Sequence, residues 1–186
     1  MQSAKALACG TRNRGDRVSI LHRNAGAMHA WIDVYEHADT SRQTPDQVSV
    51  LDVMLSSLEL YGIDLQRIPL MNKDSLEMTQ DDHDLIAETA GSFAKNHDGI
   101  LIVHGTDKLH ITGERICELL VTPVPIVLTG AMKPWELRTT DAMQNLTEAL
   151  TAIQLVGPGV YVAMHNRVLK FPGVTKDIQQ GAFVKL

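Results

Sequence analysis

The stretch GILIVHGTDK, residues 99–108, decides the fold class of this chain. It follows a turn at Asp98, and its first five residues are wholly apolar. A short, unbroken apolar run of this kind is typical of a strand buried on both faces, as in parallel sheets covered by helices. The polar residues after it, from His104 to Lys108, would then lie where the strand ends and the next helix begins.

The same alternation of apolar runs and helical periodicity extends along most of the chain. Thr79 and Asp82 form a capping-box pattern, which predicts a helix start. The expected helices span residues 45–58, 79–96, 109–121 and 140–155. The expected strands span residues 17–22, 66–70, 99–103, 125–129 and 159–164, with a hairpin return at 167–170 and a long loop at 23–44. This order predicts an α/β fold with an open, mostly parallel sheet and helices on both faces.

Composition excludes several classes of protein. The 186 residues, 44% of them hydrophobic, fit one ordinary domain with a real core. No apolar run is long enough to cross a bilayer, and residues 1–10 do not resemble a secretory signal, so we expect a cytoplasmic protein without membrane contact. The net charge of −5 argues against a nucleic-acid partner. Cys9 and Cys117 show no spacing typical of a disulfide framework or a zinc site.

Charge is unevenly distributed at the start of the chain. Residues 1–31 carry one lysine and four arginines against a single acidic residue, Asp16. A basic arm for nucleic acid would fit this bias, but it lacks an aromatic platform beyond Trp31. We therefore interpret residues 1–31 as an atypical leader, which can include the first strand, and residues 32–186 as a single α/β domain.

The loop after residue 103 is the sharpest candidate site. Ligands of open α/β sheets bind outside the carboxyl ends of the strands. Thr106 offers a hydroxyl and Asp107 a carboxylate, while Gly105 gives the backbone freedom next to a helix start that favours negative charge. The plainer interpretation, to which we give equal weight, is that Thr106 or Asp107 only caps the helix.

A hydroxyl needs a base to become a nucleophile, and a lysine can serve when a carboxylate orients it. Lys176 follows the last expected strand pair, although by itself it would be interpreted as a solvated surface residue. Ala131, after the strand at 125–129, lets backbone approach a ligand or simply forms a tight turn. Asp74 and Ser75 are candidates for substrate binding or for satisfying a turn.

The motifs of several other enzyme classes and of metal sites are missing from the sequence. The sequence contains no dinucleotide-binding glycine pattern, no P-loop and no G-x-S-x-G elbow. The eight histidines are scattered, and His104 and His110 do not have the spacing of a helical metal pair. We therefore expect neither a metal nor a cofactor.

Five blocks of sequence carry a resemblance to a known family. In chain order they are NKDSLEMT (72–79), GILIVHGTDK (99–108), PIVLTGAMKP (125–134), TTDAMQNLTEAL (139–150) and GVTK (173–176). The chain from about residue 46 onward resembles L-asparaginases, particularly the short, single-domain asparaginase-like proteins. The His-Gly-Thr-Asp block together with the Thr-Gly-Ala-Met block makes the resemblance specific.

The resemblance implies a flavodoxin-like, three-layer sandwich and hydrolysis of L-asparagine to L-aspartate and ammonia. Thr106 would position or activate the attacking water or hydroxyl. Asp107 would bind the substrate's α-amino group and polarise Lys176, which handles the proton, and Ser75 would hold the α-carboxylate. The resemblance also implies a small-molecule substrate, with L-glutamine as a second candidate, and no cofactor. The protein is expected to form a homodimer or a higher homo-oligomer.

Two departures from the family pattern bear on activity. The Thr-Gly-Gly-Thr loop, which supplies the family's main nucleophile, is absent from the sequence. We hypothesise that residues up to about Trp31 are not the ancestral leader. A displaced reading frame or an altered start would produce such a replacement. Tyr35 is the candidate for the family's mobile lid tyrosine. The chain ends soon after Lys176, without the smaller C-terminal domain of full-length asparaginases.

Three functions therefore remain open. The first is an asparaginase-type amidohydrolase centred on Thr106, Asp107 and Lys176. The second is a catalytically inactive relative that binds aspartate, asparagine or a related amino acid. The third is a subunit of a larger amidotransferase that delivers ammonia to another protein.

Overall fold

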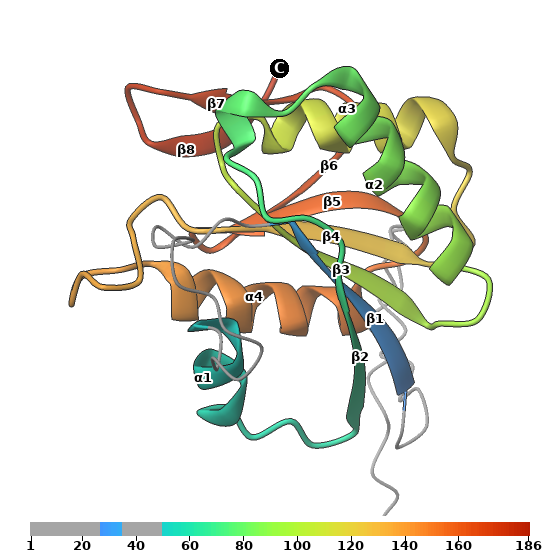
Figure 1. Ribbon diagram of the computed structural model, residues 1–186, viewed down its shortest axis with the longest axis horizontal. Coiled ribbons are helices and arrows are strands. Elements are labelled where there is room, and N and C mark those ends of the chain that lie inside the picture. Colours follow the sequence, from blue (N-terminus) through green and yellow to red (C-terminus); the bar gives the residue numbers. More distant parts are fainter. Residues whose placement is uncertain (1–26, 35–49) are drawn as a thin grey trace, which may run out of the picture.

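The computed structural model describes residues 27–34 and 50–186, and its centre is a six-stranded sheet (Figure 1). The strand order is β2-β1-β3-β4-β5-β6, with every neighbouring pair parallel except β5 and β6. The strands are β1 (Ala27–Val34), β2 (Ile63–Pro69), β3 (Gly99–His104), β4 (Pro125–Thr129), β5 (Gly159–Met164) and β6 (Arg167–Lys170). The order of the first five is that of flavodoxin-like sheets, so the expected fold is confirmed.

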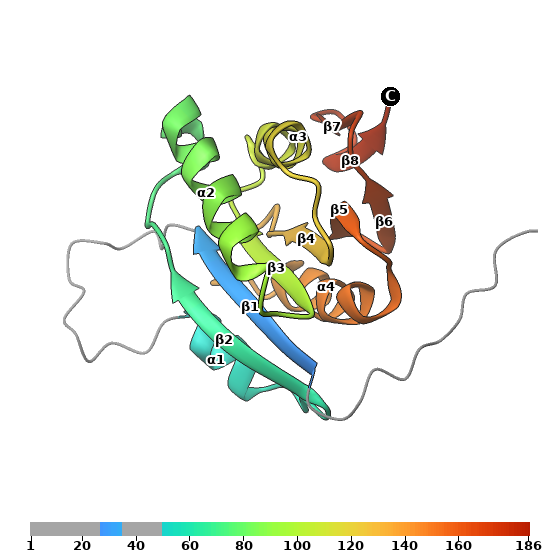
Figure 2. The same cartoon turned by 90° about the vertical axis from the view of Figure 1, so that its right-hand side faces the viewer.

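Helices cover both faces of this sheet (Figures 1 and 2). On one face lie α2 (Gln80–Phe93) and α3 (Leu109–Leu119), and on the other lie α1 (Val50–Ser56) and α4 (Ala142–Leu155). Successive residues of β3 divide between two cores, as strand geometry requires. Ile100 and Ile102 pack with the cluster under α2 and α3, whereas Leu101 packs with the cluster under α1 and α4.

The start of α2 is confirmed at the atomic level. The carboxylate of Asp82 accepts a hydrogen bond from the backbone N–H of Thr79 at 2.6 Å, which completes the capping box. Hydrogen bonds from Lys73 and then from the Thr79 backbone hold the pKa of Asp82 down to about 2. The short 3-10 helix η2 (Ser75–Glu77) precedes this cap.

The interpretation of residues 23–44 as a loop is wrong for residues 27–34. These residues form β1, an inner strand that pairs with both β2 and β3. Polar residues interrupt its apolar pattern, and the hydrogen bonds of two neighbouring strands stabilise it instead. The strand expected at residues 17–22 lies outside the described residues. β1 includes residues on both sides of the boundary expected after residue 31.

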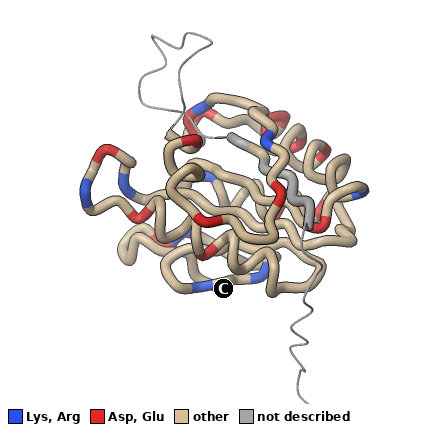
Figure 3. Tube along the Cα trace, turned by 90° about the horizontal axis from the view of Figure 1, so that it is seen from below, with Lys and Arg blue, Asp and Glu red and all other residues tan. Residues whose placement is uncertain are grey.

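The hairpin of β7 (Val174–Asp177) and β8 (Ala182–Lys185) was not expected. It forms a separate two-stranded sheet, so Lys176 lies within a strand rather than after the last one. In the described part of the chain, no helix is long and apolar enough to span a membrane. Positive and negative residues are interspersed along the described trace (Figure 3).

Candidate active site

The loop after β3 lies at the point where the strand order of the sheet reverses. Val34, the last residue of β1, is in register with His104, the last residue of β3. Chain connections leave β1 and β3 in opposite directions along the sheet, and flavodoxin-like folds place their ligands at this position. The fold therefore puts Gly105, Thr106 and Asp107 where a ligand site is expected.

Thr106, Asp107 and Lys176 meet at this edge of the sheet. The side-chain amine of Lys176 donates to Oγ1 of Thr106 at 3.0 Å and to Oδ1 of Asp107 at 2.6 Å. Thr106 is buried, with 7% of its surface exposed, and the Lys176 side chain is 15% exposed. The Asp107 side chain is 47% exposed, so one end of the cluster faces solvent. The three predicted residues thus form a contiguous hydroxyl–amine–carboxylate group.

Contacts with α3 place Lys176. The carboxylate of Glu114 accepts hydrogen bonds from the backbone N–H groups of Gly173 and Val174, at 2.5 and 3.1 Å. Gly173 has a φ of +89°, a conformation that favours glycine. The buried side chain of Val174 joins the core under α3. These contacts fix the start of β7 two residues before the amine.

Ser75 lies directly against the loop. A Cβ built on Gly105 would come within 2.7 Å of the Ser75 hydroxyl oxygen, so a glycine is required there. Ser75 is buried, and it packs beside the residue that precedes Thr106 in the chain. Asp74 is exposed, and its carboxylate accepts a hydrogen bond from the Leu76 backbone N–H at 2.8 Å. That carboxylate therefore caps η2, which is the turn role considered from the sequence.

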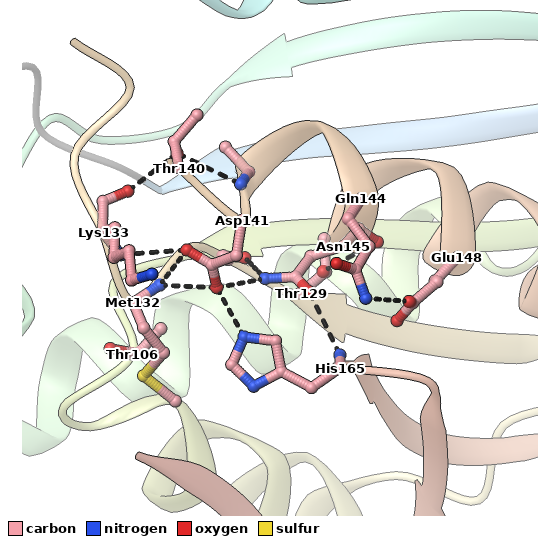
Figure 4. A network of polar contacts seen from close by, with 12 residues as sticks. Thr106, Thr129, Met132, Lys133, Thr140, Asp141, Gln144, Asn145, Glu148 and His165 are labelled. Atoms are coloured by element: carbon pink, nitrogen blue, oxygen red, sulfur yellow. Dashed lines mark hydrogen bonds and ion pairs between the residues drawn. The ribbon is translucent and has the colours of Figure 1, made fainter. Parts of the chain in front are cut away.

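A second polar cluster holds the loop that follows β4 (Figure 4). Asp141 occupies the N-cap position of α4, but its carboxylate makes no helix cap. It accepts hydrogen bonds instead from the backbone N–H groups of Met132 and Lys133, at 3.0 Å each. The side chains of Asn145 and His165 donate to the same carboxylate, at 2.7 Å each. Burial alone would raise the pKa of Asp141, but these hydrogen bonds outweigh it and lower the pKa.

Asn145 connects this cluster to two strand ends. Fully buried, it donates to the Gly130 carbonyl oxygen at 2.9 Å and accepts from the His165 backbone N–H at 3.1 Å. Gly130 in turn lies against the His104 carbonyl, because a Cβ on Gly130 would be 2.2 Å from that oxygen. The cluster therefore braces the loop that carries Ala131 against the Thr106 loop.

Sequence reasoning did not select Asp141 or Asn145, and it picked out His165 only as a residue at the carboxyl end of an expected strand. Asp141 and Asn145 belong to the block at 139–150, where an Asp before a helix is ordinarily interpreted as a cap. His165 occupies a two-residue turn between β5 and β6 with a φ of +54°. The short connection between two expected strands predicts a turn at His165, but it does not predict the ion pair of His165 with Asp141.

An apolar cavity of about 60 Å³ lies on the α1 and α4 face, and its lining includes Gly130, Ala131, Trp135 and Leu146. It does not contact Thr106, Asp107 or Lys176. Within residues 27–34 and 50–186, no group of three or more His, Cys, Asp or Glu side chains could hold a metal ion. The candidate lid Tyr35 lies outside the described residues.

Comparison with known proteins identifies the family. Residues 34–181 match the family model of the asparaginase N-terminal domain. An L-asparaginase of Thermococcus kodakarensis is 33% identical over 116 residues, which are 62% of this chain and 35% of that protein. A subunit of the glutamyl-tRNA(Gln) amidotransferase of Methanobrevibacter smithii is 41% identical over 77 residues, 41% of this chain and 18% of that protein.

The solved structures agree with the sequence comparison. The thermostable L-asparaginase from Thermococcus kodakarensis superposes with a TM-score of 0.74 and 26% identity, over 86% of this chain and 51% of that chain. This chain thus spans about half the length of the solved asparaginase and a smaller share of the curated relatives it matches. Since the family match covers most of the sequence and agrees with the sheet order and the Thr106 loop, the chain belongs to the asparaginase family.

Proposed function

We propose that this protein hydrolyses the side-chain amide of L-asparagine, giving L-aspartate and ammonia. The observation that carries the proposal is the contact of the Lys176 amine with both the Thr106 hydroxyl and the Asp107 carboxylate. Lys176 lies 70 residues from Thr106 in the chain, so its contact with the Thr106 and Asp107 side chains, at the edge where such sheets bind ligands, is not a by-product of local structure. Belonging to the asparaginase family supports the same reaction class.

The arrangement provides a proton path for amide hydrolysis. When Lys176 is neutral, its nitrogen can accept the proton of the Thr106 hydroxyl, or of a water beside it, and so raise the nucleophilicity of that oxygen. The oxygen attacks the amide carbon, the carbon–nitrogen bond breaks, and the proton passes to the departing nitrogen as ammonia forms. Where that oxygen belongs to Thr106, a water then hydrolyses the resulting ester, which releases aspartate and restores the hydroxyl. Asp107 orients the amine throughout, because it accepts one of the amine's hydrogen bonds.

The surroundings of the cluster suit a small amino-acid amide. We assign the substrate ammonium group to the exposed part of Asp107 and the substrate carboxylate to the Ser75 hydroxyl, which is buried and packs on Gly105. We expect asparagine to be preferred and glutamine to be tested beside it. We also expect a homodimer or higher homo-oligomer, as the family resemblance implies.

Ammonia release from asparagine tests the proposal. Thr106→Ala should reduce turnover to background, while the free energy of unfolding changes by less than about 1 kcal/mol, since little apolar area is lost. Thr89→Ala is the matched control, because that threonine bonds its own helix at the exposed Leu85 carbonyl. Turnover that survives Thr106→Ala would remove the hydroxyl from the mechanism.

Two other functions have specific support. The match to an amidotransferase subunit favours a role as the ammonia-producing part of a complex, and co-purification of a stable partner would support that role. The absence of a Thr-Gly-Gly-Thr sequence favours an inactive amino-acid-binding relative. Calorimetric titration with aspartate identifies the inactive relative, in which the ligand binds and the wild-type protein releases no ammonia.

A further inference from the structure

A chain of buried hydrogen bonds connects α2 to the Thr106 loop. Nδ1 of His83 lies 2.7 Å from Oγ1 of Thr112, and that oxygen lies 2.8 Å from Nε2 of His104. Nδ1 of His104 then lies 2.6 Å from the Gly105 carbonyl oxygen. His104 and Thr112 are fully buried and His83 is 3% exposed. The two imidazole rings are stacked, with centroids 6.4 Å apart and planes within 10° of parallel.

The partners determine the direction of every bond in this chain. The Gly105 carbonyl only accepts, so His104 carries its proton on Nδ1 and its Nε2 is an acceptor when the ring is neutral. The Thr112 hydroxyl must then donate to His104 and accept from Nδ1 of His83. Burial, opposed by the Gly105 hydrogen bond, holds the pKa of His104 down to about 4, and burial followed by the charge of Lys108 lowers the pKa of His83. Both rings are therefore neutral near pH 7, as this direction requires.

We infer that His83 and Thr112 are positioning residues for the Thr106 hydroxyl, an inference that rests on the proposed function for its kinetic consequence. The last bond of the chain fixes the Gly105 carbonyl, and so fixes the orientation of the peptide group that joins Gly105 to Thr106. A reorientation of this peptide changes the φ angle of Thr106, and the 3.0 Å contact of its hydroxyl with the Lys176 amine depends on that backbone. A fully satisfied polar chain in a buried setting rigidifies what it holds, because each broken link leaves a buried donor or acceptor unpaired.

The alternative is that the chain only contributes to the stability of the fold. Thr112→Val distinguishes these two interpretations. Valine has nearly the shape of threonine but lacks the hydroxyl in the middle of the series of hydrogen bonds. Thr112→Ser restores a hydroxyl and serves as the rescue. Thr147→Val is the control at an exposed helical position, since the hydroxyl of that threonine bonds the Met143 carbonyl of its own helix, at 2.8 Å.

The first measurement needs no turnover. Nuclear magnetic resonance of the protein labelled with 13C and 15N should show His104 protonated on Nδ1. Thr112→Val should shift the Thr106 amide and the Lys176 ε-carbon resonances, Thr112→Ser should return them toward wild type, and Thr147→Val should leave them unchanged. A His104 proton on Nε2 overturns the inference, as does a Thr112→Val protein with a lower Tm and unmoved Thr106 and Lys176 signals.

The second measurement is kinetic. In Thr112→Val, kcat for ammonia release should fall about tenfold to a hundredfold with KM nearly unchanged, because small displacements of a reacting group have effects of that size. A wild-type protein that releases no ammonia contradicts the proposed function, and the resonance measurement then decides the positioning inference alone. Where Thr112→Val does not fold, His83→Leu breaks the chain at its first link, and His83→Asn, which keeps a donor near the Nδ1 position, is its rescue under the same criteria.

Discussion

The ring of Phe171 ends against the backbone of Gly113 in the middle of α3. A Cβ built on Gly113 would lie 2.3 Å from Cζ of Phe171, a distance that no real contact allows. Phe171 is buried, and it begins the segment that leads through Gly173 to β7. Because Gly113 has no side chain, the Phe171 ring packs directly on α3 and holds the start of the strand that carries Lys176.

Gly113→Ala should destabilise the protein despite the higher helix propensity of alanine. Propensity favours the alanine by about 1 kcal/mol. The overlap with Phe171 should cost about 1–3 kcal/mol, as overpacking of a core does, and should displace the start of β7. We expect a lower Tm and reduced ammonia release. Gly91→Ala on α2 is the control, because its Cβ would meet only the movable end of the Leu120 side chain, and an equal loss in both variants would contradict the role given to the ring.

Lys176→Met should abolish ammonia release while the fold is retained. Methionine keeps much of the apolar stem and removes the amine that contacts Thr106 and Asp107. Lys95→Met removes an exposed lysine at the end of α2 and should leave turnover unchanged. Comparing kcat/KM of the two variants decides the matter, and a Lys176→Met enzyme with near wild-type turnover would exclude the amine from the proton path.

Asp141→Asn should loosen the loop after β4. The asparagine offers one acceptor oxygen in place of two, and its amide would face other donors, so we expect a loss of about 2–4 kcal/mol. Urea denaturation measures this loss. Asp64→Asn, at an exposed position of β2, should change the unfolding midpoint little. A midpoint as high in Asp141→Asn as in that control would show that the carboxylate does not hold Met132 and Lys133.

Stability should decrease as the pH falls from about 6.5 to about 4. The pKa of His104 is lowered from 6.5 to about 4 in the folded protein, so the unfolded chain binds more protons throughout this interval. The shift corresponds to a loss of about 3 kcal/mol, complete near pH 4. The lowered pKa of His83 acts in the same direction, with Lys108, Asp82, Asp84 and His110 as the charged groups around it.

Denaturant unfolding at several pH values measures this dependence. His104→Asn removes the titrating ring, so its stability should vary less between pH 6.5 and pH 4 than that of the wild type. The carboxylates act in a separate window: the pKa of Asp82, lowered from 3.8 to about 2, gives stability that is lost only below about pH 4. An unchanged slope in His104→Asn would contradict the assignment of a neutral, buried ring.

Much of the fold could be predicted because its signals are local. The strands β3, β4 and β5 are unbroken apolar runs, and α2 begins at a capping box, so composition and periodicity within about ten residues define each element. β1 was not predicted because its own pattern of apolar residues is weak. Its pairing with a strand on each side stabilises it instead. The strands β7 and β8 were not predicted because each has only four residues and is stabilised by pairing with the other.

The order of residues alone predicts the alternating α/β pattern, the edge of the sheet that holds the candidate site and the residue types at that edge. Three contacts depend on packing between distant segments: Lys176 reaches Thr106, Asp141 binds a loop instead of capping its helix, and His83 connects to the Gly105 carbonyl through Thr112 and His104. The two kinds of interaction differ in range. Apolar periodicity and helix caps act between neighbours in the chain, whereas the direction of a buried hydrogen bond depends on partners that packing brings together from distant segments.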